Sequence, residues 1–180
     1  GPWELACPMR PKVDIIMLTH SRPDMALPAL QTIIKLKEET PYRILLVNNG
    51  GDKHVESMCR WFRANTRSYV PWAKYRSTRC KVVSPGKNLG FSGGNNYAAK
   101  RATAEWLLFI NDDAFPQTEN WLTQLIATAE KHGAAAVGPI SDYVLGLQHM
   151  KFGRAWPEVH PAKFLSGFCL LIKRKVFEKL

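Results

Sequence analysis

Residues 106–113, Trp106-Leu107-Leu108-Phe109-Ile110-Asn111-Asp112-Asp113, carry the most informative pattern in this chain of 180 residues. Five apolar residues in succession are typical of a β-strand that is buried on both faces. The two carboxylates that follow would be costly to bury without a partner, and oxygen ligands suit a hard divalent cation such as Mg²⁺ or Mn²⁺. The pattern therefore makes Asp112 and Asp113 candidate metal ligands, although Asn and Asp are also preferred in turns and at helix N-caps.

Similar apolar runs recur on both sides of this strand, and stretches with helical periodicity lie between them. Strands are predicted at residues 12–18, 42–47, 81–83, 106–110, 134–137 and 164–172, and helices at residues 24–39, 55–65, 95–103, 120–132 and from 174 onward. Strands that alternate with helices in this way predict a single α/β domain with a mainly parallel sheet. We expect this domain over residues 12–180, and a tag remnant or N-terminal extension over residues 1–11.

Small polar or acidic residues follow each of the first four predicted strands. They are Thr19 and Ser21, then Asn48 and Asn49, then Asn88, and finally Asn111, Asp112 and Asp113. In parallel sheets, ligands bind beyond the carboxyl ends of the strands. Because four strands end in this way, the sequence predicts a polar ligand lying across one edge of the sheet.

The glycine-rich segment at residues 85–96 separates the third and fourth of these strands, and its composition predicts a turn before the helix at 95–103. Gly86, Gly90, Gly93 and Gly94 would let the backbone approach an anion closely at the start of that helix. The spacing matches neither the dinucleotide-binding fingerprint nor a P-loop. An ordinary turn without a ligand is the alternative interpretation.

The net charge of +10 originates in one part of the chain, where Lys and Arg dominate. Overall, 25 Lys and Arg residues stand against 15 Asp and Glu residues, but between Ser57 and Ala104 there are ten basic residues and no acidic one. Such a stretch favours an anionic partner, namely nucleic acid, a phosphorylated small molecule or an acidic membrane surface. The alternative is a solvated basic face.

The remaining composition excludes several classes of protein. No run of 18 apolar residues is present, which argues against a transmembrane helix, and the first residues do not resemble a signal peptide. The four cysteines form no C-x-x-C pair, so no zinc site is predicted. We expect a cytoplasmic protein with reduced thiols, and peripheral contact with an acidic membrane as a second location.

Three blocks of sequence are similar to a known family. Residues 88–96, 106–113 and 165–172, followed by Arg174 and Val176-Phe177, resemble the family 2 glycosyltransferases, in particular their bacterial rhamnosyltransferase-like branch, and the resemblance runs from about Val13 to Leu180. It implies a GT-A (Rossmann-like) fold, a nucleotide-diphosphate-sugar donor, Mn²⁺ or Mg²⁺, and a role in polysaccharide biosynthesis. The implied reaction is inverting transfer to a hydroxyl of a glycan, lipid-linked or protein-linked acceptor.

The resemblance also implies roles for individual residues. Donor binding falls to Thr19, Ser21, Arg22, Asn48, Asn88, Gly90, Asn111 and Asp112, the metal to Asp113 and Asp112, and the donor-sugar and acceptor side to Ser166, Gly167 and Phe168. Two positions depart from the family pattern, because Asn48 and Asn111 replace carboxylates that are common there. An amide still accepts hydrogen bonds but brings no charge, so donor preference and metal affinity would differ.

The catalytic base is the part of the family pattern that this chain does not match. In the family it is an acidic residue beyond the helix that begins near Arg174, so we expect it after Leu180. Asp142, Glu158 and His160 are alternative bases, and no spacing favours one of them.

Two other functions stay open. The chain could bind nucleotide without catalysing transfer. It could also bind nucleic acid through the basic stretch at residues 57–104, where Trp61, Tyr69, Trp72 and Tyr75 would stack on bases, although no recognised nucleic-acid-binding motif is present.

Overall fold

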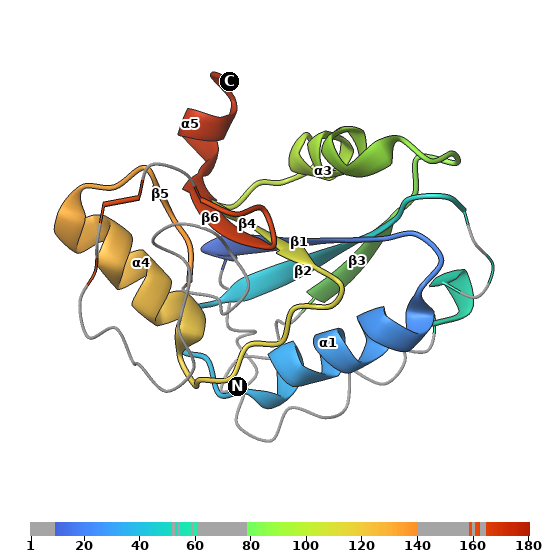
Figure 1. Ribbon diagram of the computed structural model, residues 1–180, viewed down its shortest axis with the longest axis horizontal. Coiled ribbons are helices and arrows are strands. Elements are labelled where there is room, and N and C mark those ends of the chain that lie inside the picture. The colour runs from blue at the N-terminus through green and yellow to red at the C-terminus, as the bar shows by residue number, and fades with distance from the viewer. Residues whose placement is uncertain are drawn as a thin grey trace, which may run out of the picture.

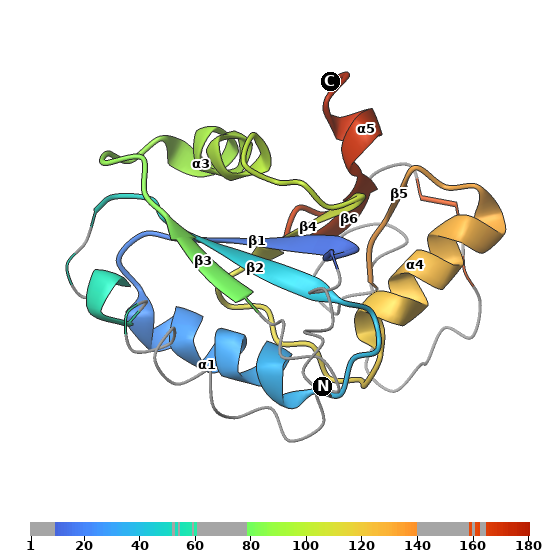
Figure 2. The same ribbon diagram turned by 180° about the vertical axis from the view of Figure 1, so that it is seen from behind.

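A six-stranded sheet forms the middle layer of the protein, with helices on both of its faces (Figures 1 and 2). The computed structural model describes residues 10–51, 53, 55–58, 60, 79–139, 159, 161–162 and 165–180. The strands are β1 (Val13–Thr19), β2 (Tyr42–Asn48), β3 (Arg79–Val83), β4 (Trp106–Asn111), β5 (Ala136–Val137) and β6 (Cys169–Lys173). The helices are α1 (Pro23–Lys35), α3 (Gly90–Ala99), α4 (Trp121–His132) and α5 (Arg174–Phe177). None of these helices is long and apolar enough to cross a membrane.

The strand order is β3-β2-β1-β4-β6-β5. Strand β1 pairs in parallel with β2 and with β4, and β2 pairs in parallel with β3, which confirms the predicted mainly parallel sheet. Strand β6 is antiparallel to both β4 and β5. The start of β6 therefore lies at the same edge of the sheet as the carboxyl ends of β1, β2 and β4.

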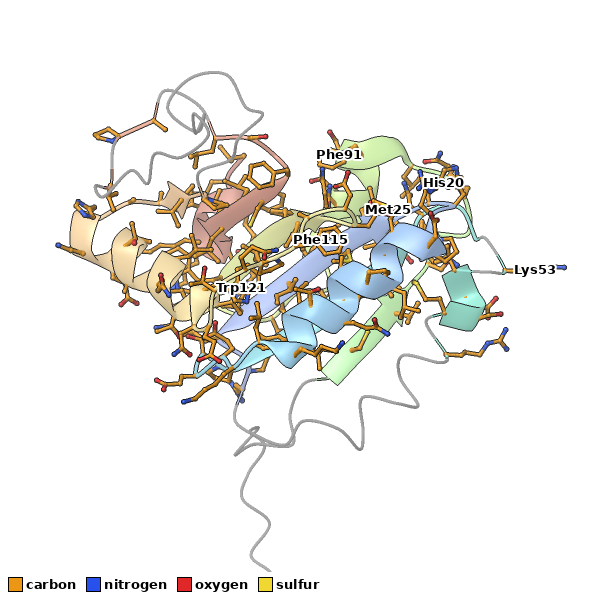
Figure 3. All side chains as sticks on the ribbon, turned by 60° about the horizontal axis from the view of Figure 1, so that its bottom comes forward. His20, Met25, Lys53, Phe91, Phe115 and Trp121 are labelled. Atoms are coloured by element: carbon orange, nitrogen blue, oxygen red, sulfur yellow. The ribbon has the colours of Figure 1, made fainter. Side chains whose placement is uncertain are left out.

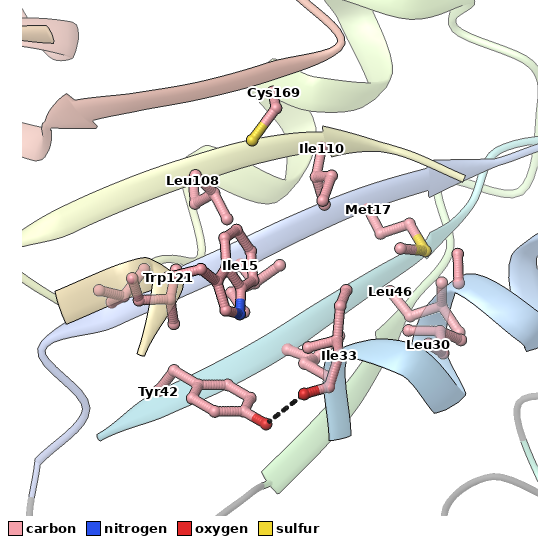
Figure 4. Packing of buried hydrophobic residues seen from close by; sticks show 14 of the residues in the cluster. Ile15, Met17, Leu30, Ile33, Tyr42, Leu46, Leu108, Ile110, Trp121 and Cys169 are labelled. Carbon is pink, nitrogen blue, oxygen red and sulfur yellow. Dashed lines mark hydrogen bonds between the residues drawn. The ribbon is translucent and has the colours of Figure 1, made fainter. Parts of the chain in front are cut away.

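Helices pack against both faces of the sheet. Helices α1 and α4 cover one face, and a large apolar cluster that includes Ile15, Met17, Leu30, Leu108 and Trp121 fills the space between them and the sheet (Figure 4). Helices α3 and α5 cover the other face over a smaller cluster that includes Ile16, Leu45, Leu107, Ala98 and Phe177. Successive strand residues point to opposite faces, so burial on both faces explains the continuous apolar runs in the sequence.

Helix α3 corrects the predicted helix at residues 95–103, because it begins at Gly90 and ends at Ala99. Residues 90–96 of the segment expected as a glycine-rich turn therefore form the first turns of the helix, and residues 85–89 precede it. Gly94 is needed there, since a Cβ at this position would lie 2.4 Å from Leu18 Cδ1 and 3.1 Å from Asn49 Cγ. The glycine thus allows the helix to pack closely against the ends of β1 and β2.

Helix α1 also ends earlier than the predicted helix at residues 24–39, because Leu36 already has an extended backbone. The reason lies in Glu38, whose buried carboxylate reaches the start of α4. Its Oε2 accepts a hydrogen bond from Leu122 N (2.9 Å), and its Oε1 accepts one from Thr123 Oγ1 (2.6 Å). A carboxylate at a helix N-terminus satisfies free amides and complements the helix dipole, so this tertiary contact stops α1 from continuing.

The predicted strand at residues 164–172 starts too early, and the predicted helix at residues 55–65 is only partly described. Strand β6 begins at Cys169, because Gly167 and Phe168 form a turn before it, whereas the prediction began the strand at residue 164. Residues 55–58 are helical as predicted, and the rest of the predicted helix at 55–65 is described only at residue 60.

A buried ion pair lies near the amino ends of the parallel strands. The side chain of Asp14 is fully buried, and its two oxygens accept hydrogen bonds from Arg43 Nε (2.7 Å) and Nη2 (2.8 Å). Its Oδ2 also accepts from the backbone N–H groups of Thr103 (2.7 Å) and Ala104 (2.9 Å). Asp14 thereby ties β1 to β2 and to the segment that leads into β4.

Candidate functional site

The carboxyl edge of the sheet brings together most of the site residues predicted from the sequence. In the strand register Thr19 lies beside Asn48, and Leu18 lies beside Asn111. The backbone N–H of Asn111 donates to the carbonyl of Phe168 (2.8 Å), so residues 166–168 reach the same edge. This is a direct result of the antiparallel direction of β6, which starts where β4 ends.

Asn49 connects the end of β2 to the start of α3. Its side chain is buried, and its Nδ2 donates to Asn88 Oδ1 (3.1 Å) and to the carbonyl of Gly90 (3.1 Å). Its Oδ1 accepts from the backbone N–H of Leu89 (3.0 Å). Asn88 Oδ1 in turn accepts from the N–H of Gly90 (2.8 Å). The loop at residues 88–90 is therefore held against the sheet by side-chain amides.

Replacing Asn49 by alanine is expected to lower the free energy of unfolding by about 1–3 kcal/mol, because buried partners in the loop lose their hydrogen bonds. Hydrogen exchange at the Leu89 amide should also accelerate, since that N–H donates to Asn49. Asn96→Ala, at an exposed position of α3, is the matched control and should change little. Equal effects of the two substitutions would contradict this role for Asn49.

His20 also lies at this edge, although the sequence assigned it no role. Its Nε2 lies 3.5 Å from Asn88 Nδ2, and its ring occupies the space that a side chain at position 50 would need. A Cβ on Gly50 would be 2.4 Å from His20 Nδ1. Neither His20 nor Asn49 has a local spacing signal, because their partners lie far away in the sequence. The doublet Asn48-Asn49 after a strand was the nearest indication.

The two carboxylates after β4 occupy different environments, because Asp112 is half-buried and Asp113 is exposed. Burial raises the pKa of the Asp112 carboxyl above its ordinary range. The nearby Thr19 hydroxyl opposes this rise in pKa, and the negative charge of Asp113 adds to it. The polar and charged groups around Asp112 therefore do not fully offset the cost of burying its ionised carboxylate.

The positive charge of Arg22 lowers the pKa of Asp112, but the Arg22 guanidinium is mainly engaged with another residue. It forms a bidentate ion pair with Asp24, with Nη2–Oδ2 at 2.8 Å and Nε–Oδ1 at 3.0 Å, and both side chains are exposed. The hydrogen bonds between the two side chains raise the pKa of Arg22 and lower the pKa of Asp24. Arg22 would therefore have to exchange or share this partner in order to contact an anionic ligand.

A divalent cation fits the donor set at Asp112 and Asp113. The two carboxylates are adjacent in sequence, and Asp112 is half-buried with a raised pKa. A divalent cation would offset the negative charge of such a pair. No cluster of three His, Cys, Asp or Glu side chains suited to a metal occurs in the part of the chain that the structure describes. Mg²⁺ is typically bound by one or two protein carboxylates, and water and phosphate oxygens fill its remaining coordination positions.

The other predicted site residues lie at the margin of this edge or outside the residues that the structure describes. Ser21 and Asn88 are exposed at the site edge, and Ser166 is partly buried beside it. The alternative bases Asp142, Glu158 and His160 lie outside the described residues, as do Trp61, Tyr69, Trp72 and Tyr75 of the nucleic-acid hypothesis.

Comparison with known proteins places this geometry in a family. The model of glycosyl transferase family 2 matches residues 14–180, so the chain belongs to this family. It is 24% identical over 201 residues to the O-antigen biosynthesis protein RfbC of Myxococcus xanthus, covering 94% of this chain and 14% of that protein. It is 25% identical over 131 residues to the galactofuranosyltransferase GlfT1 of Mycolicibacterium smegmatis, covering 71% of this chain and 38% of that protein.

Solved structures show the same fold. The mannosyltransferase PcManGT from Pyrobaculum calidifontis, in complex with GDP-Man and Mn²⁺, superposes with a TM-score of 0.69 at 18% identity and covers 99% of this chain and 50% of that one. TarS 1–349 of S. aureus in complex with UDP gives a TM-score of 0.65 at 18% identity, with 93% and 48% covered. The chain therefore has the GT-A fold implied by its sequence, and it spans half or less of the length of these relatives.

Proposed function

We propose that this domain binds a nucleotide-diphosphate sugar with Mn²⁺ or Mg²⁺ and takes part in inverting transfer of the sugar to a hydroxyl acceptor. The observation that carries the proposal is the half-buried Asp112 beside Asp113, at the edge where the ends of β1, β2 and β4 and the 88–90 loop meet. Membership of the family and the GDP-Man and UDP complexes of the structural relatives support it. Acceptors of glycan or lipid-linked type belong to the same proposal.

The residues at the edge divide the work. Asp112 and Asp113 would hold the divalent cation, which when bound supplies positive charge that offsets the negative charge of a departing diphosphate. Asn48 and Thr19, buried at adjacent strand ends, would form a neutral polar floor beneath the nucleoside. The exposed 88–90 loop, held by Asn49, would lie beneath the donor, and residues 166–168 would line the sugar side. The base that accepts the proton of the acceptor hydroxyl is not assigned to a described residue.

Calorimetric titration of the intact chain with GDP-mannose, UDP-glucose and dTDP-rhamnose, each with Mn²⁺ and with EDTA, tests the proposal. At least one donor should bind, and it should bind more tightly with Mn²⁺ than with EDTA. The folded state should be stabilised accordingly, with a melting temperature that rises with donor concentration. The absence of binding by every donor, or tight binding of single-stranded DNA with a steep salt dependence, would contradict it. Binding without turnover in the presence of acceptor would favour the inactive, nucleotide-binding alternative.

The pH dependence of metal binding follows from Asp112. Because its pKa is raised in the folded protein, the carboxyl becomes protonated at a higher pH than an ordinary aspartate. Only the ionised form ligates a metal, so Mn²⁺ affinity should fall on acidification, and the fall should begin at a higher pH than for an ordinary aspartate. Without metal the sign for stability is opposite. Ionised Asp112 lowers the free energy of unfolding at pH values above its folded-state pKa, and this destabilisation is lost as the pH falls from the folded-state pKa to the lower pKa of the unfolded chain.

Manganese titrations followed by electron paramagnetic resonance at several pH values measure this dependence. The Asp112→Asn variant should bind more weakly at pH 7 and show a shallower decline on acidification. The same pH profile in both proteins would mean that Asp112 does not control metal binding.

A further inference from the structure

Phe91, the second residue of α3, is an exposed aromatic side chain at the candidate site (Figure 3). Its exposed fraction is 55%, and only three other large hydrophobic residues in the described part of the chain are exposed: Phe115, Val159 and Leu180. A single exposed hydrophobic residue needs no special explanation. Phe91 differs from an isolated exposed residue because its ring lies against a glycine of a distant segment and because hydrogen bonds fix its backbone.

The neighbour of the Phe91 ring is a glycine from a distant segment. A Cβ built on Gly167 would lie 3.7 Å from both Cε1 and Cζ of Phe91, so the ring stands against position 167. Gly167 itself is exposed and carries no side chain to cover the ring. The two residues therefore leave an accessible aromatic surface between the start of α3 and the turn before β6.

The backbone around Phe91 is fixed from several directions. Its carbonyl accepts a hydrogen bond from Asn95 Nδ2 (3.0 Å), and the preceding Gly90 N–H donates to Asn88 Oδ1 (2.8 Å). On the other side, the carbonyl of Phe168 accepts from Asn111 N–H (2.8 Å), which fixes the turn that contains Gly167. An aromatic ring on a fixed backbone provides contact area at a low cost in conformational entropy.

We propose that Phe91 and Gly167 form a subsite that receives the apolar C–H face of a hexopyranose ring, with Phe91 as the stacking platform. This inference rests on the proposed function, because it assigns the sugar of the donor or of the acceptor to a place at that site. A sugar ring has one face rich in C–H groups, and an aromatic face in a partly polar site is the surface that such a face contacts best. The adjacent glycine leaves the space that the ring requires.

The test uses the intact chain and a donor pair that the wild-type protein binds, chosen among GDP-mannose with GDP, UDP-glucose with UDP, and dTDP-rhamnose with dTDP. If the donor sugar occupies the subsite, Phe91→Leu should weaken the sugar nucleotide about three- to tenfold and leave the free diphosphate unchanged. If the acceptor sugar occupies it, both affinities stay the same. In that case saturation-transfer signals of methyl rhamnoside or methyl mannoside, recorded with saturating diphosphate, should decrease.

Further variants make the result specific. Phe91→Trp keeps an aromatic face and should retain sugar binding, whereas Gly167→Ala places a methyl group on the ring at an ordinary contact distance and should weaken it. Phe115→Leu makes the same chemical change at another exposed phenylalanine and should affect neither measurement.

Unchanged sugar recognition in Phe91→Leu, or an equal loss in Phe115→Leu, would overturn the subsite. A wild-type protein that binds none of the nucleotides would instead overturn the proposed function itself. The two failures are therefore distinguishable.

Discussion

Replacing Asp14 by alanine is expected to lower the free energy of unfolding by about 3–5 kcal/mol. The substitution leaves Arg43 without its carboxylate and removes the acceptor of two backbone N–H groups, at Thr103 and Ala104. Domains of this kind are stabilised by about 5–15 kcal/mol in total, so the loss would be a large fraction. Urea denaturation measures it directly, and the melting temperature should fall by roughly 10 °C.

The control for this prediction is an exposed ion pair near the same end of β1. Lys12 Nζ lies 3.2 Å from Glu130 Oε1, and both side chains are well exposed. Glu130→Ala should therefore cost about 0–1 kcal/mol. Asp14→Asn, which preserves shape and one acceptor oxygen, should fall between Asp14→Ala and the wild type. A loss below about 1 kcal/mol for Asp14→Ala would show that the buried pair contributes little.

The double substitution Asp112→Asn, Asp113→Asn is expected to have the largest effect on ligand binding. In the presence of Mn²⁺ the affinity for the sugar nucleotide should fall roughly 100-fold or more, because the charge compensation by a bound cation is worth several kcal/mol. In EDTA the variant should bind at least as tightly as the wild type, because the repulsion between the two carboxylates and the diphosphate is removed. Calorimetric titration under both conditions separates the metal-dependent part of the affinity from the rest.

Glu119→Gln provides the matched control, since Glu119 is an exposed acid on the same segment between β4 and α4. It should retain the metal-dependent affinity. The assignment of the metal to Asp112 and Asp113 would be wrong if the double variant kept its Mn²⁺ response, or if Glu119→Gln lost it to the same extent.

Much of the fold could be predicted because its central strands are buried on both faces. Continuous apolar runs identified β1, β2 and β4 to within about one residue, and the parallel register then placed Thr19, Asn48 and Asn111 at one edge. These features depend on local composition and on a general property of parallel sheets. They do not require knowledge of any particular long-range contact.

The start of α3 could not be predicted in this way. Glycine is unfavourable in a helix, so residues 85–96 indicated a turn. In the folded protein, hydrogen bonds from Asn49 and Asn88 fix the start of the helix, and close packing at Gly94 requires the absence of a side chain. The role of Asn49 depends on partners about forty residues away, and sequence spacing contains no information about such contacts.

The position of the Asp14–Arg43 pair has an evolutionary consequence. Asp14 and Thr19 are five residues apart on β1, which at about 3.3 Å per residue separates the two ends of the strand by roughly 16 Å. Substitutions that far apart and without shared partners have additive effects on stability. Mutations at the carboxyl edge, where we propose that the nucleotide binds, can therefore accumulate while the ion pair maintains the sheet. This separation would let related proteins change donor preference while keeping the same scaffold.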